Sequence, residues 1–251
     1  MFNKKIIDKK KLKKKPKQET RKMVLITVDS KESDFEVYFK DPIPITPTHE
    51  IGLTSATFWY SWYNISDDFD NNTLKLLHEG NWEKYTIPDG NYDSENLNYR
   101  MEDVFGSPPI VFDTNAATNR FIIGCSEPGV EIDLSEGRLH QLLGFEPRIY
   151  KDMINIGTRV GNITRDVDRV LVHCNLVSGS YQNNMASDII YSFAPSVAPG
   201  SQIQCEPYQP KYLPIRATDY IYSLRIHVTD QQNRPIDFRG ETLTLVFDLK
   251  K

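Results

Sequence analysis

The N-terminal segment holds the densest group of side chains that could make a chemical contact. Residues 1–22 contain eleven Lys and Arg residues against two acidic ones, which gives the segment a net charge of +9. Lysines at this density attract phosphate groups or an acidic protein surface through charge. The candidate contact residues form its central run: Lys9, Lys10, Lys11, Lys13, Lys14, Lys15 and Lys17.

The remainder of the chain has the opposite charge. The whole chain carries −4, so residues 23–251 carry −13 and would repel DNA. Residues 1–22 have few apolar side chains and many like charges, so we expect a basic disordered arm. Two compatible uses stay open for it: a solubilising or nuclear-targeting tail, or an arm that meets phosphate or an acidic protein surface. It lacks the apolar stretch of a secretory signal, so we expect no signal peptide.

The five histidines and three cysteines show no spacing typical of a metal site. His173 precedes Cys174, but neighbours on a strand point to opposite faces and would not share one ion. Cys125, Cys174 and Cys205 are too scattered for a Cys-x-x-Cys motif or a disulfide framework. We therefore expect packing or surface histidines, reduced thiols, no bound metal and no cofactor.

No motif for catalysis is found either. Residues 178–181 (SGSY) lack the Gly-x-Ser-x-Gly arrangement of a nucleophile elbow. A glycine-rich phosphate loop does not occur. A jelly-roll enzyme of the cupin type would need clustered histidines around a metal, and these are scattered. We expect that the protein is not an enzyme.

The elements that would position any site are mostly strands. Near the C-terminus, apolar residues alternate with polar ones on both sides of a polar turn, which predicts two strands with one buried face each. We expect Leu224, Ile226, Val228, Leu243, Leu245 and Phe247 to share one core, with Tyr222 on the same face. Further strands are expected at 35–40, 50–65, 82–87, 119–125, 129–134, 168–177 and 186–195, the pair within 119–134 forming a hairpin.

Two short helices interrupt these strands. One is expected at about 94–105, capped by Asp93 or Ser94 and ended by the prolines that follow. The other lies in 132–145, with Ser135 as its N-cap and Gly144 in the left-handed position after its last turn.

The fold class that follows is all-β. Eight to ten strands with long crossover loops suit a single jelly roll, a two-sheet Greek-key sandwich with one or two short helices in its loops. Hydrophobic residues make up 39% of the 251, enough for a sizeable core. We predict a basic arm over residues 1–22 and a single jelly-roll domain over residues 23–251.

The last forty residues resemble the end of adenovirus penton-base proteins. Those proteins share the order Leu-Pro-apolar-Arg, an apolar strand with Thr and Asp at its end, and then an arginine before a closing strand. The positions that match here are Leu213, Pro214, Arg216, Asp230 and Arg234.

Other segments are similar to the penton-like minor capsid proteins of Polinton/Maverick elements and adintoviruses. They are IDLSEGRLHQLLGF (132–145), IPDGNYDSENLNYRM (87–101) and DRVLVHCNLVSG (168–179). The resemblance implies a structural minor capsid protein that forms homopentamers at the fivefold vertices of an icosahedral capsid. Its implied partner is a major capsid protein with a double jelly roll. The implied location is the virion, after assembly in the host nucleus or cytoplasm.

The resemblance has limits, and another class stays open. Adenovirus penton base carries an Arg-Gly-Asp loop that contacts integrins, and no such tripeptide occurs here, so neither receptor binding nor fibre attachment carries over. The alternative is a jelly-roll attachment protein or lectin-like binding module, which would use exposed aromatic loop residues for sugar. Residues 59–64 (WYSWYN) are the candidate stretch, and we expect them to pack in the core instead.

Overall fold

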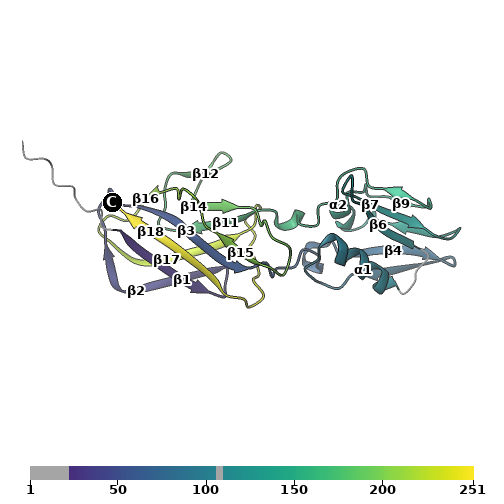
Figure 1. The fold of residues 1–251 in the computed structure, drawn as a ribbon, viewed down its shortest axis with the longest axis horizontal. Coiled ribbons are helices and arrows are strands. Elements are labelled where there is room, and N and C mark those ends of the chain that lie inside the picture. The colour runs from purple at the N-terminus through teal and green to yellow at the C-terminus, as the bar shows by residue number, and fades with distance from the viewer. Residues whose placement is uncertain (1–22, 106–109) are drawn as a thin grey trace, which may run out of the picture.

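The computed structural model describes residues 23–105 and 110–251, which form two bodies along one long axis (Figure 1). The first body contains both termini of the described chain and its own hydrophobic core. The second is built from a segment between two strands of the first and has a separate core. We call them the jelly roll and the inserted body.

Eight principal strands make the two sheets of the jelly roll. One sheet has the order β1 (Val24–Ser30), β18 (Leu243–Lys250), β3 (Glu50–Trp59) and β15 (Gln202–Cys205), with the short β16 (Leu213–Pro214) also pairing with β3. The other has the order β14 (Ile189–Phe193), β11 (Val170–Cys174), β17 (Tyr220–Thr229) and β2 (Asp34–Pro44). Numbered along the chain, these eight strands stand in the orders 1-8-3-6 and 5-4-7-2. Two interleaved Greek keys in this order are a jelly roll, so the predicted fold class is confirmed.

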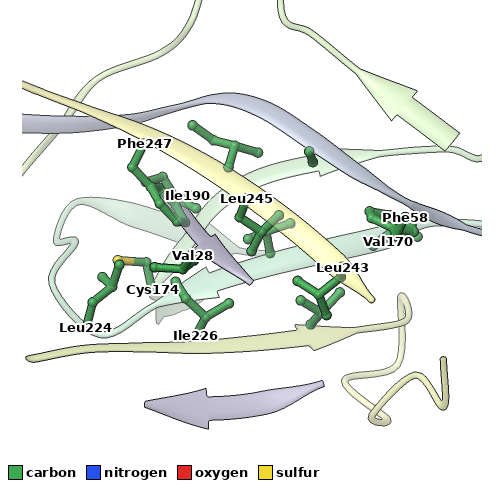
Figure 2. Packing of buried hydrophobic residues seen from close by; sticks show 14 of the residues in the cluster. Val28, Phe58, Val170, Cys174, Ile190, Leu224, Ile226, Leu243, Leu245 and Phe247 are labelled. Carbon is green, nitrogen blue, oxygen red and sulfur yellow. The ribbon is translucent and has the colours of Figure 1, made fainter. Parts of the chain in front are cut away.

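The alternation of apolar and polar residues in β17 and β18 explains how the two sheets pack together. β17 and β18 follow each other in the chain but belong to opposite sheets, so their apolar faces meet across the sandwich. All six residues predicted to share a core are buried in the cluster that Figure 2 shows from close by. Burial of such side chains supplies most of the favourable free energy of a sandwich.

The predicted orientation of Tyr222 was wrong. Its side chain is 64% exposed, while Ile221 is buried. The pairing of β17 with β2 shifts between Ile221 and Ser223. A bulge of this kind shifts the alternation of buried and exposed side chains by one residue. On the N-terminal side of the bulge, the inward-facing residue is therefore Ile221 and not Tyr222.

The inserted body lies between β3 and β11 and contains two further sheets. Its strands are β4 (Thr73–His78), β5 (Asn81–Thr86), β6 (Ile110–Asn115), β7 (Arg120–Cys125), β8 (Glu131–Asp133), β9 (Ile149–Tyr150) and β10 (Asn155–Ile156). They pair in the orders β5-β4-β8-β9 and β10-β7-β6. The two helices, α1 (Ser94–Phe105) and α2 (Leu139–Leu143), also belong to this body. A small hairpin, β12 (Ser180–Gln182) with β13 (Met185–Ser187), extends from the jelly roll.

Three predictions need correcting here. We expected one sandwich over residues 23–251, whereas the apolar residues from Ile65 to Tyr150 form their own core. We expected 119–125 and 129–134 to pair as a hairpin, whereas β7 and β8 lie in different sheets. We expected eight to ten strands, and the described residues form eighteen, many of two or three residues. Alternation along a strand identifies its buried face but not the sheet that it joins.

The helices agree with the sequence only in part. Asp93 caps α1 as predicted, because its Oδ1 accepts a hydrogen bond from the backbone N–H of Asn96 at 2.7 Å. Ser135 does not cap α2: its N–H and hydroxyl both donate to Asp133, and α2 begins after Arg138. Gly144 ends α2 with a φ of 78°, as predicted. None of the helices in the described ranges is long and apolar enough to cross a membrane.

Candidate functional site

The jelly roll has two different ends, and strand register fixes what is attached to each. Val24 pairs with Leu249 of β18, whereas Thr57, near the end of β3, pairs with Thr244 at the other end of β18. The chain enters the inserted body just after β3. The start of β1, which residues 1–22 precede in the sequence, therefore lies at the end of the jelly roll opposite the inserted body. We call these the arm end and the junction end.

The predicted contact lysines lie outside the described residues. They are Lys9, Lys10, Lys11, Lys13, Lys14, Lys15 and Lys17. The structure describes the strand that follows this segment, in which Val24 pairs with Leu249 of β18.

The first half of the penton-like motif lies at the arm end. Leu213 and Pro214 form β16 and pair with Ile51 and Glu50 at the start of β3. The carbonyl of Pro214 accepts a hydrogen bond from the N–H of Ser178 at 3.0 Å. Two residues later, the N–H of Arg216 donates to the carbonyl of Leu176 at 2.8 Å. Residues 213–216 therefore form hydrogen bonds both to β3 of one sheet and to the chain that follows β11 of the other, and so connect the two sheets.

The second half of the motif lies at the junction end. Asp230 is buried at the end of β17, and Arg234 Nε donates to its Oδ2 at 2.5 Å. The other oxygen, Oδ1, accepts the backbone N–H groups of Gln232 and Arg234 at 2.8 and 2.9 Å. The pair therefore shapes the turn after β17 by satisfying backbone donors that the turn would otherwise leave unpaired.

Arg234 also reaches out of the jelly roll. Its Nη2 donates to the backbone carbonyl of Asp166 at 2.7 Å, and its guanidinium lies 4.9 Å from the centre of the Phe69 ring. Phe69 and Asp166 belong to the two chain segments that connect the bodies. The resemblance identified Asp230 and Arg234 by position, and the structure gives both a role at the junction.

A buried carboxylate lies at the centre of this junction. The side chain of Asp166 is only 2% exposed. Its Oδ1 accepts a hydrogen bond from Arg138 Nη2 at 2.6 Å, and its Oδ2 accepts one from Asn71 Nδ2 at 3.0 Å. A buried charge is tolerated when partners of this kind compensate for its lost hydration. We call Asp166, Arg138, Arg234 and Asn71 the junction network.

The sequence contained no local signal for most of this network. Asp166 lies 95 residues from Asn71 and 28 from Arg138, so neither pair forms a motif along the chain. Only Arg234 was singled out, and by family resemblance. The junction network connects the inserted body to the jelly roll, and both oxygens of its buried carboxylate accept hydrogen bonds from Arg138 and Asn71.

His173 and Cys174 point to opposite faces of β11, as predicted for neighbours on a strand. His173 faces away from the core: its Nδ1 lies 2.7 Å from Asp188 Oδ1 and its Nε2 3.0 Å from Thr229 Oγ1. Cys174 points into the core, and burial raises the pKa of its thiol to about 12. His227 of β17 pairs with His173 of β11, and burial lowers the pKa of the His227 side chain. Within residues 23–105 and 110–251, no group of three or more His, Cys, Asp and Glu side chains could hold a metal ion.

The aromatic stretch proposed for sugar binding is mainly a packing element. Tyr60 and Trp62 are buried in the core of the jelly roll, and their rings lie 4.3 Å apart. Burial raises the pKa of Tyr60 to about 12. Trp59, the last residue of β3, is 43% exposed. The expectation that this stretch packs in the core is confirmed for its two central rings.

Charge is distributed unevenly along the molecule. Residues 60–167, which contain the inserted body, carry eighteen acidic and nine basic side chains, a net of −9. Residues 23–251 together carry −13, so the residues of this range outside 60–167 carry a net charge of only −4. The most acidic part of the chain and the +9 arm are thus attached to opposite ends of the jelly roll.

Comparison with known proteins gives a likeness in fold to a solved structure. No protein-family model matches the chain, and no curated protein matches it. Among solved structures, it is similar to the crystal structure of the mavirus penton protein, with a TM-score of 0.53 and 8% sequence identity. The matched region covers 92% of this chain and 99% of that chain. The likeness therefore concerns the fold, and it extends over nearly the full length of both chains.

Proposed function

We propose that this chain is a structural capsid protein of the penton type, located in the virion. In this proposal it forms homopentamers at the fivefold vertices of an icosahedral shell, and its neighbour there is a major capsid protein with a double jelly roll. Its functional relatives would be the minor capsid proteins of Polinton/Maverick elements and adintoviruses.

The full-length likeness in fold is the observation that carries this proposal. A jelly roll alone supports many functions, so the fold class by itself would not be sufficient. Here the match to a penton protein includes the large insertion as well, because it covers 92% of this chain. The matching order of Leu213, Pro214, Arg216, Asp230 and Arg234 supports the same function from the sequence.

The two ends of the jelly roll give the subunit an orientation in the shell. Phosphate groups attract the +9 arm and repel the acidic inserted body. We therefore propose that the arm end faces the packaged double-stranded DNA and the inserted body faces outward. In this arrangement strands, loops and surface charge perform the function, and no catalytic group is required.

The experiment that tests the proposed function is native mass spectrometry of the purified chain over a concentration series. We expect a species of five copies, either alone or after mixing with the double jelly-roll protein from the same genome. Stable trimers would point to a fibre or major-capsid role. A chain that remains monomeric under both conditions and never joins shells would contradict the proposal.

A further inference from the structure

Two histidines lie side by side on the outer face of the sheet β14-β11-β17-β2. His173 of β11 and His227 of β17 are partners in the antiparallel register, and their ring centroids lie 5.6 Å apart. Their neighbours in the two strands, Cys174 and Ile226, belong to the core. Both imidazoles therefore point away from the core. The pair lies near the junction end, because β17 ends two residues after His227, at Thr229.

His173 is held from two sides. Its Nδ1 lies 2.7 Å from Asp188 Oδ1, so the carboxylate accepts the N–H of the ring, and its Nε2 lies 3.0 Å from Thr229 Oγ1. In the neutral ring, Nε2 accepts the hydroxyl proton of Thr229. A second proton on the ring turns Nε2 into a donor, and the fully buried Thr229 hydroxyl then loses this acceptor. Protonation of His173 therefore disturbs a contact at the last residue of β17.

His227 has no carboxylate to itself. Asp34 of β2 is its partner in register, but both oxygens of Asp34 accept hydrogen bonds from Arg225, at 2.9 and 2.7 Å. Among the described residues, the contact of the His227 ring is with the His173 ring, without a hydrogen bond or ion pair. Burial lowers the pKa of His227, and the charge of Asp34 opposes this shift.

The other strands of this sheet add little charge near the pair. Glu36 of β2 is opposite Arg225, and its oxygens accept hydrogen bonds from two hydroxyl groups. Lys40 and Asp41 lie further along β2, toward the arm end. β14 and the hairpin β12-β13 carry no charged side chain. A proton gained by His227 is therefore not matched by a carboxylate that lacks a partner.

We propose that His173 and His227 form an acid-responsive pair, which weakens the pairing of β11 with β17 when both rings carry a proton. Like charges at directly opposite positions of two strands destabilise the pairing between them. The end of β17 leads directly into Asp230, whose carboxylate holds Arg234 in the turn at the junction. Acid should therefore loosen the jelly roll first at the end that carries the inserted body. The inference concerns the single chain, so it does not depend on the proposed function.

The direction of the pH effect follows from the pKa of His227. This pKa is lowered in the folded chain, whereas an unfolded histidine titrates near 6.5. The unfolded state therefore binds more protons as the pH falls below about 6.5, and stability falls with it. At pH 8 the ring is neutral in both states, and it should contribute no pH dependence.

The test measures the melting temperature of the full-length chain at pH 8 and pH 5.5, at one protein concentration. His227→Gln cannot gain the charge, and the control His78→Gln removes another partly buried histidine, in β4 of the inserted body. Between the two pH values, the wild type and His78→Gln should lose about 2–4 °C more than His227→Gln. Hydrogen exchange at pH 5.5 should show faster opening of β11 and β17 in the wild type than in His227→Gln.

Each outcome decides the inference. Equal pH dependence of the wild type and His227→Gln would overturn it, and so would faster exchange at pH 5.5 that is confined to other strands. If His227→Gln is too unstable for comparison, titration of the histidine ring signals of the wild type by NMR decides. His227 should titrate below the ordinary value of about 6.5, and titration at or above that value would contradict the pair described above.

Discussion

At the scale of single residues, Asp166 is the buried carboxylate on which the junction network is centred. It is a buried carboxylate that receives hydrogen bonds from Arg138 and Asn71 of the inserted body, and its backbone carbonyl receives one from Arg234 of the jelly roll. Removing one partner from such a network leaves the others with charges or donors that water compensates incompletely. The stability of the junction should therefore depend strongly on this one side chain.

Replacing Asp166 by alanine should destabilise the protein by about 3 kcal/mol, the lower end of what breaking a buried ion pair costs, because its arginine partners are about one-third exposed. The measurement is urea unfolding followed by fluorescence. Glu136→Ala is the control: it removes a 67% exposed carboxylate that pairs only with Lys75 among the described residues and should change stability by less than about 0.5 kcal/mol. Equal effects of the two substitutions would show that the junction network contributes little.

Cys174 gives a prediction about reactivity and pH. Burial raises the pKa of this thiol to about 12. Only the thiolate reacts with iodoacetamide, so Cys174 should stay unmodified in the folded protein at pH 8 and become modified after unfolding in urea. Mass spectrometry of peptides gives the extent of modification. Rapid modification of the folded protein at pH 8 would contradict the burial of this residue.

The same pKa has a consequence for stability. The unfolded thiol loses its proton near pH 8.5, while the folded thiol keeps it until about pH 12. The unfolded state therefore binds fewer protons within this window, and stability falls as the pH rises through it. Below pH 8 both states are protonated, and Cys174 should contribute no pH dependence. Replacing Cys174 by alanine should reduce the slope of melting temperature against pH between pH 9 and 11.

At the scale of elements, β17 and β18 connect the sequence pattern to the fold. Each presents one apolar face, and the jelly-roll order places them in opposite sheets, where those faces meet. Their register is visible in which side chains are buried: Leu245 is fully buried, whereas Tyr222 is exposed beside the bulge in β17. The two residues therefore make a matched pair for testing the register.

Leu245→Ala should cost about 2–5 kcal/mol, the range for removing a large buried aliphatic side chain and leaving a cavity. Tyr222→Ala should cost less than about 0.5 kcal/mol, because its ring is largely in solvent. Chemical denaturation of both variants measures the difference. Near-equal losses, or a larger loss for Tyr222→Ala, would mean that the alternation along β17 and β18 differs from the register described above.

At the scale of the whole molecule, the arrangement of charge is the main feature. The +9 arm begins at one end of the jelly roll, and residues 60–167, with a net of −9, are inserted at the other. Where phosphate lies on one side, such a molecule should turn its arm toward the phosphate and its inserted body away from it. This polarity supports the proposed position in the shell.

Deleting residues 1–22 should abolish binding to duplex DNA, because the remaining residues 23–251 carry a net charge of −13. If about six charges of the arm contact phosphates, the log–log slope of the full-length binding constant against salt should be about −5. The sequence of the DNA should matter little, since lysine contacts with phosphate do not read bases. Fluorescence anisotropy across a salt series measures these quantities.

Two outcomes would change the proposed role of the arm. If the truncated body binds DNA as well as the full chain does, the arm is not the contact. If neither form binds DNA and the truncation loses its pentamers, the arm joins subunits and the nucleic-acid role should be dropped.

The sequence by itself determined the features that depend on neighbouring residues. Alternation identified the buried faces of the C-terminal strands, Asp93 and Gly144 marked ends of helices, and the charges of residues 1–22 stood apart from the rest. These signals are local, because side-chain direction, capping and charge density need no knowledge of distant partners. The order of matching motifs also predicted a penton-type fold.

Only the tertiary structure decided which segments meet. The separate core of the inserted body, the different sheets of β7 and β8, and the junction network all join residues far apart in the chain. A strand pattern favours any partner sheet with a complementary apolar face, so the choice among them depends on the packing of the whole chain. The buried position of Asp166 and the exposed position of Ile154 are consequences of that choice, and the same two residue types could have had the reverse environments in another fold.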